Sequence, residues 1–128
     1  MSSWRAKLQY PGQSFSIYFL SKGGRCPTEE LLAGLARGDI QSSRKATAYL
    51  QRLAQRGTPQ NDEVCKKLPD DLWELKPQPY RLFFFIRGNG AYFTHGYKKE
   101  TRRLQAGQLE RARRIRNAFL ANSGEELT

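Results

Sequence analysis

The 128-residue chain carries 22 lysines and arginines against 12 aspartates and glutamates, which gives a formal net charge of +10. Its length argues for a single domain over residues 1–128, and its 38% hydrophobic content predicts a buried core rather than a disordered basic tail. The longest apolar run, residues 82–86, is too short to cross a bilayer, and residues 14–20 lack the cleavage site of a signal peptide. We therefore expect a cytoplasmic protein with no membrane partner, whose excess charge attracts a polyanion.

Cysteine and histidine are too few for several classes of enzyme. Cys26 and Cys65 lie far apart and form no C-x-x-C pair, so neither a disulfide framework nor a zinc ribbon is indicated. His95 is the single histidine, and no G-x-S-x-G segment supplies a serine nucleophile. We expect no bound metal and no cofactor.

The first half of the chain predicts one strand and two helices. Residues 14–20 are rich in aromatic and β-branched side chains, which is typical of a strand. Residues 28–38 predict a helix with Thr28 as its N-cap and two acids in its first turn. A second helix is predicted from about residue 42 to residue 56, where apolar side chains recur with helical spacing before a glycine.

The second half predicts three closely spaced strands, at residues 72–76, 80–86 and 91–97, and then a basic helix at residues 106–121. The apolar stripe of this helix consists of Leu109, Ala112, Ile115 and Phe119. Residues 122–128 are expected to form a frayed tail. The predicted order is β-α-α-β-β-β-α, an α+β domain in which a small antiparallel sheet packs one face on helices and leaves the other face free for a partner.

The predicted strands carry side chains suited to cleaving RNA at the 2′-hydroxyl. Arg81 can hold phosphate oxygens with both prongs of its guanidinium group. Glu74 or His95 can accept the proton of the 2′-hydroxyl. Each also has an ordinary structural interpretation, because Glu74 and Arg81 can form a salt bridge and a lone histidine is often a core residue.

Residues at the end of the last predicted strand complete this set. Lys99, Lys98 or Tyr97 can donate a proton to the leaving oxygen or stabilise negative charge. Strand alternation predicts that Phe93, His95 and Tyr97 share one side of that strand. A solvated charge pair is the ordinary alternative for the two lysines.

Further cations predict a broad, salt-sensitive grip on RNA. These residues are Lys76, Lys98, Arg102, Arg103, Arg111, Arg113 and Arg114.

Three segments then resemble a known family. They are Leu72-Trp73-Glu74-Leu75-Lys76, then Tyr80-Arg81-Leu82-Phe83-Phe84-Phe85, and Thr94-His95-Gly96-Tyr97-Lys98-Lys99. Together they resemble the phage-derived, HigB-like branch of the RelE superfamily, the toxins of bacterial toxin–antitoxin systems. This resemblance implies a RelE-like fold and an mRNA interferase, a metal-independent endoribonuclease that cleaves mRNA in the ribosomal A site. It also implies an antitoxin partner, a HigA-like helix-turn-helix protein.

The same resemblance implies roles for particular residues. Arg81 matches the phosphate-binding arginine of such toxins, and Lys99 matches the basic residue that closes the last strand. Lys76 stands where the family pattern has arginine, which keeps the charge but loses the planar fork. Glu74 stands where the RelE branch has lysine, so that branch's acid–base assignment does not transfer. The alternative function is a nonenzymatic, basic module of phage origin that binds nucleic acid or a host factor.

Overall fold

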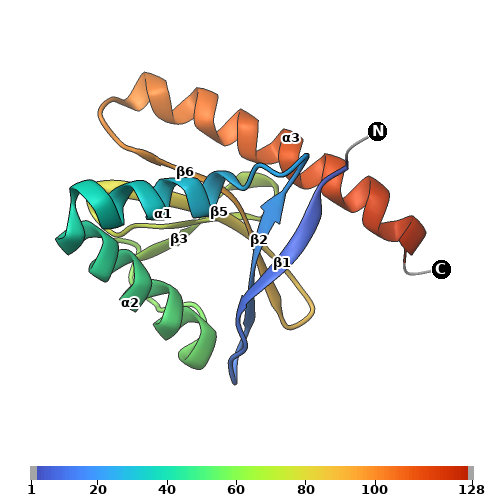
Figure 1. Cartoon of the computed structure of the whole chain (residues 1–128), viewed down its shortest axis with the longest axis horizontal. Coiled ribbons are helices and arrows are strands. Elements are labelled where there is room, and N and C mark those ends of the chain that lie inside the picture. Colours follow the sequence, from blue (N-terminus) through green and yellow to red (C-terminus); the bar gives the residue numbers. More distant parts are fainter. Residues whose placement is uncertain (1–2, 127–128) are drawn as a thin grey trace.

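The computed structural model describes residues 3–126, and it shows an α+β fold in which a six-stranded sheet lies between helices (Figure 1). The strands are β1 (Arg5–Tyr10), β2 (Ser16–Ser21), β3 (Cys65–Lys67), β4 (Leu72–Leu75), β5 (Tyr80–Arg87) and β6 (Gly90–Lys98). The helices are α1 (Pro27–Gly38), α2 (Ile40–Arg56) and α3 (Arg102–Glu126), with a short 3-10 turn, η1 (Pro69–Asp71), before β4.

The sheet has the strand order β1-β2-β6-β5-β4-β3 and is mixed rather than antiparallel throughout. The predicted antiparallel pairing of β4 with β5 and of β5 with β6 is confirmed. β2, however, pairs with β6 in parallel, because the chain crosses over through α1 and α2 before it returns to the sheet. β1 and β3 were not predicted, and they form the two edges.

Helices cover both faces of the sheet, so the prediction of one open face is wrong. α1 and α2 pack on one face, where Leu50 and Leu53 of α2 meet Phe84 and Phe93 of the sheet. α3 packs on the opposite face, and Figure 1 shows it on the other side of the strands from α1 and α2. Large apolar side chains project from both faces, so each face needs a cover. On the α3 side these are Leu72, Phe83 and Phe85, which pack with Ala112, Ile115 and Phe119 of the predicted stripe.

The helix boundaries differ from the predicted ones at their ends. The N-cap of α1 is Cys26 rather than Thr28, because Pro27 suits the first helical position and Thr28 is buried inside the helix. Asp39 caps α2 by accepting a hydrogen bond from the backbone N–H of Ser42 at 3.2 Å. α3 begins at residue 102 and continues to residue 126, so it includes most of the predicted tail. Residues 127 and 128 of that tail lie outside the described part of the chain.

A β-bulge in β6 divides the strand into two halves that face differently. Phe84 pairs with Phe93, whereas its neighbour Phe83 pairs with His95, so Thr94 is the extra residue. Phe93 therefore joins the core under α1 and α2, while His95 and Tyr97 lie on the α3 face. The prediction that Phe93 shares a side with His95 and Tyr97 is wrong for this reason. No described helix is long and apolar enough to cross a membrane.

Candidate functional site

Three adjacent strands bring a cluster of polar side chains together on the α3 face of the sheet. Glu74 of β4 pairs with Phe83 of β5, and Arg81 of β5 pairs with Tyr97 of β6. Because residues two apart on a strand share a face, all four side chains lie on the same side. We call Glu74, Lys76, Arg81, Tyr97 and Lys99 the polar cluster.

Glu74 is at the centre of the cluster, with only 1% of its surface exposed. Its Oε1 atom lies 3.7 Å from Nε of Arg81 and 3.8 Å from Nζ of Lys76. Its Oε2 atom accepts a hydrogen bond from the side-chain amide of Gln105 in α3, at 3.1 Å. A buried carboxylate is costly unless it is paired and hydrogen-bonded, and these contacts meet both needs.

Arg81 is 5% exposed and uses only part of its donor set. Its Nη1 atom donates to the side-chain oxygen of Gln78 at 2.9 Å and to the carbonyl of Tyr80 at 3.0 Å. Its Nε–H has no hydrogen-bond acceptor among the described residues, and neither does the buried hydroxyl of Tyr97. Both groups can donate to the oxygen of an anion.

Lys76 and Lys99 add positive charge on the more exposed side of the cluster. The side chain of Lys76 is 16% exposed, and Lys99 is half-buried. The backbone N–H of Lys99 donates to the carbonyl of Pro79 at 2.9 Å, which fixes it beside the start of β5. Burial lowers the pKa of Lys76 below its usual value, Glu74 opposes this shift, and nearby cations that include Lys99 reinforce it. Lys76 and Arg81 thus flank the carboxylate of Glu74. Lys76, predicted only to bind RNA, therefore lies beside the predicted catalytic residues.

Tyr97 remains protonated at neutral pH. Its pKa is raised to about 12, mainly by burial and also by the charge of Glu74, while Arg81 opposes the shift. Its ring stacks on Phe83 with centroids 5.7 Å apart. The hydroxyl is therefore held as a proton donor close to the Glu74–Arg81 pair.

His95 lies on the same face but outside the polar cluster. Phe83 pairs with both Glu74 and His95 in the sheet, so its ring stands between them, 5.3 Å from the imidazole centroid. His95 is completely buried, and its Nε2 atom lies 2.8 Å from the side-chain oxygen of Gln108 in α3. Burial is the main reason that its pKa falls to about 4. A neutral imidazole in this position links α3 to the sheet.

The cations predicted to grip RNA differ in how exposed they are. Lys98, Arg111 and Arg114 are exposed. Arg113 instead forms an ion pair with Asp70 at 2.8 Å and another with Glu110, so its charge is largely compensated. Arg102 and Arg103 begin α3, but their side chains lie outside the described part of the structure.

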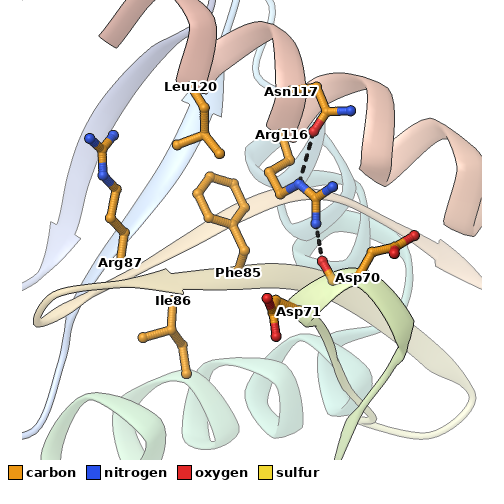
Figure 2. A pocket seen from close by; sticks show the side chains of 8 residues that line it. All are labelled: Asp70, Asp71, Phe85, Ile86, Arg87, Arg116, Asn117 and Leu120. Atoms are coloured by element: carbon orange, nitrogen blue, oxygen red, sulfur yellow. Dashed lines mark hydrogen bonds between the residues drawn. The ribbon is translucent and has the colours of Figure 1, made fainter. Parts of the chain in front are cut away.

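A separate hollow of about 590 Å³ lies farther along β5, between η1 and the middle of α3 (Figure 2). Arg116 crosses it and donates hydrogen bonds to the carbonyl of Asp70 and to the side-chain oxygen of Asn117. Asp70 and Asp71 both have positive φ values, 63° and 58°, in the turn that presents this carbonyl. These contacts fasten α3 to the η1 turn, and none of the polar cluster lines the hollow.

Sequence reasoning missed three glutamines that contact the predicted residues. Gln78 accepts from Arg81, Gln105 donates to Glu74, and Gln108 bonds His95. Glutamine carries no local signal for such a role, and two of the three contacts depend on how α3 docks.

The comparison with protein families gives one match. Residues 35–117, more than half of the chain, match the family described as phage-derived protein Gp49-like. No curated protein matches the sequence significantly. The matched segment contains β4, β5 and β6 and therefore the whole of the polar cluster.

Proposed function

The chain belongs to the Gp49-like family of phage-derived proteins, and from this membership and the polar cluster we propose that it is an endoribonuclease toxin of the RelE/HigB type. In this proposal it acts on mRNA at the ribosome, in the cytoplasm, and a helix-turn-helix antitoxin neutralises it. The family membership and the sequence resemblance support a toxin–antitoxin role. The polar cluster supports the chemistry.

The proposed reaction uses the 2′-hydroxyl of the RNA as nucleophile. Glu74 accepts the proton of that hydroxyl, and its oxygen attacks the adjacent phosphorus. Arg81 and Lys99 stabilise the added negative charge on the phosphate, with Arg81 contributing its unused Nε–H. The bond to the 5′-oxygen breaks, and Tyr97 or Lys76 gives that oxygen a proton. The products are a 2′,3′-cyclic phosphate and a 5′-hydroxyl end.

The observation that carries the proposal is the pair of unused donors beside a buried carboxylate. Arg81 Nε–H and the Tyr97 hydroxyl lack acceptors among the described residues, although unpaired buried donors are normally costly. An anionic phosphate oxygen would satisfy both. The nearby cations Lys76 and Lys99 favour the same ligand.

In this proposal RNA reaches Glu74 when the first turns of α3 move away from the sheet. Glu74 and Arg81 are almost fully buried in the structure, and Gln105 of α3 bonds Glu74 directly. The proposal therefore includes an open form in which this contact is broken.

Burial of the cluster also favours a second candidate, a basic binding module with no catalytic activity, in which Glu74 and Arg81 form a structural ion pair. Mapping of transcript 5′ ends after induced expression separates the two. We expect new ends with the wild type and none with Arg81→Ala or with Arg81→Lys, which keeps the positive charge and the fold. Intact transcripts with the wild type, or unchanged cleavage by a folded Arg81→Lys variant, would refute the nuclease proposal.

A further inference from the structure

The outer surface of α2 is positively charged, and its cations do not belong to the polar cluster. The helix has four cations, Arg44, Lys45, Arg52 and Arg56, and no acidic residue. All four are exposed, and no ion pair within the described part of the chain involves them. Such a helix surface is complementary to a polyanion.

Three of these cations share one face of the helix. Lys45, Arg52 and Arg56 are seven and four residues apart, spacings that return to the same side of an α-helix. The helical rise separates them by about 10 Å and about 6 Å along the axis. Tyr49 lies on the same face, with its ring centroid 6.0 Å from Nζ of Lys45. This row of cations can follow a phosphate backbone.

A hollow of about 190 Å³ opens beside this row. Tyr49 and Arg52 supply an aromatic ring and a guanidinium group to it, and Ala48, Pro59, Val64 and Leu75 supply apolar walls. No acidic residue in the described part of the chain lines it. An aromatic ring, apolar walls and an adjacent cation are the features that hold an unstacked base in single-stranded nucleic-acid sites.

We propose that α2 and this hollow form a second binding site, for single-stranded RNA. One base enters the hollow against Tyr49, and the neighbouring phosphates bind Lys45, Arg52 and Arg56. The site lies on the opposite side of the sheet from the polar cluster, because α2 and α3 cover opposite faces. It therefore binds RNA independently of the proposed cleavage.

The test is fluorescence anisotropy with the full chain and a short, fluorescein-labelled, single-stranded 2′-O-methyl RNA. This RNA cannot be cleaved through its 2′-oxygen, so the result does not depend on the proposed nuclease activity. The triple variant Lys45→Ala/Arg52→Ala/Arg56→Ala should bind at least tenfold more weakly. For this variant, the slope of log affinity against log salt concentration should be shallower by about 2, the value for three phosphate contacts to a single strand.

A matched triple variant, Arg5→Ala/Lys22→Ala/Arg37→Ala, removes the same charge from exposed positions elsewhere and should change affinity less than threefold.

Ala48→Leu fills the hollow without changing charge, and it should weaken RNA binding severalfold but leave inorganic polyphosphate binding unchanged.

Three results would overturn the proposal. Equal losses in the two triple variants would show a general charge effect. Unchanged RNA binding by Ala48→Leu would show that no base enters the hollow. An α2 variant that keeps its RNA affinity but loses binding to polyglutamate would assign this surface to an acidic protein instead.

Discussion

The Oε1 atom of Glu74 lies 3.7 Å from the Nε atom of Arg81, and both side chains are buried between the sheet and α3. At this distance the two charges attract each other, but the Nε–H of Arg81 forms no hydrogen bond within the described part of the protein. The pair therefore keeps a carboxylate and an unused guanidinium donor side by side. Arg81 can therefore bind one phosphate of an RNA while Glu74 accepts the proton of the adjacent 2′-hydroxyl.

Replacing Glu74 by glutamine should affect chemistry more than stability. Both Glu74→Gln and Glu74→Ala remove the charge that pairs with Arg81, but glutamine keeps the volume of the side chain and can still bond Gln105, so we expect a folded protein whose RNA cleavage is at least about a hundredfold slower. Glu74→Ala also loses the bond to Gln105 and leaves a cavity, and it should cost about 3 kcal/mol of stability. Urea unfolding and a cleavage assay on one mRNA measure the two effects. Wild-type cleavage by Glu74→Gln would show that Glu74 is not the base.

The buried His95 should make the protein less stable in mild acid. Its pKa is lowered to about 4 in the folded protein and is about 6.5 when unfolded, so the unfolded state binds the proton more readily. The free energy of unfolding should fall by up to about 3 kcal/mol as the pH drops from 6.5 to 4. His95→Gln removes this titration, so urea unfolding of the two proteins between these pH values isolates it. Identical pH dependence in both would contradict the prediction.

The first turns of α3 should control access to the polar cluster. Gln105→Ala/Gln108→Ala removes the hydrogen bonds to Glu74 and His95, while alanine preserves helix propensity. We expect RNA cleavage to rise severalfold and hydrogen exchange to quicken in α3. Gln13→Ala, at an exposed position distant from α3 in sequence, is the control and should change neither. Slower cleavage by the double variant would show that the two glutamines assist the reaction rather than close the site.

Gly96 should be intolerant of a side chain because α1 packs closely on β6. An added Cβ would lie 2.4 Å from a methyl carbon of Leu82 and 2.6 Å from one of Leu31. Gly96→Ala should therefore destabilise the protein by about 1–3 kcal/mol. Gly34→Ala is the matched control, because a Cβ there meets nothing within 4 Å and the residue lies inside α1. That change should stabilise the protein by about 0.5–1 kcal/mol, and urea unfolding of both variants checks the contrast.

Periodicity in the sequence was enough to predict much of the fold. Alternation placed Trp73 and Leu75 on one face of β4 and Glu74 on the other, as the structure has them. Helical spacing likewise identified Ala112 and Phe119 as core positions of α3. In both segments the spacing of the apolar residues specifies the type of element and which side chains share a face.

The remaining features depend on tertiary contacts. β1 is the exception: Ala6, Leu8 and Tyr10 alternate with polar residues there, a strand pattern that the prediction did not use. The bulge at Thr94 reverses which residues face α3, and strict alternation cannot predict it. The sequence patterns predicted that Glu74 and Arg81 could lie close together. They did not predict that α3 covers both residues, because the docking of that helix follows from the shape of the assembled core.

The central claim is that RNA is cut through its own 2′-hydroxyl beside Glu74 and Arg81. The most direct measurement uses a ribosome-bound synthetic mRNA with a single 2′-deoxynucleotide immediately before the mapped cleavage position. The proposed mechanism predicts that the all-RNA substrate is cut to a 2′,3′-cyclic phosphate and a 5′-hydroxyl, and that the 2′-deoxy substrate stays intact at that position. Equal cleavage of both substrates, or cleavage of neither, would contradict it.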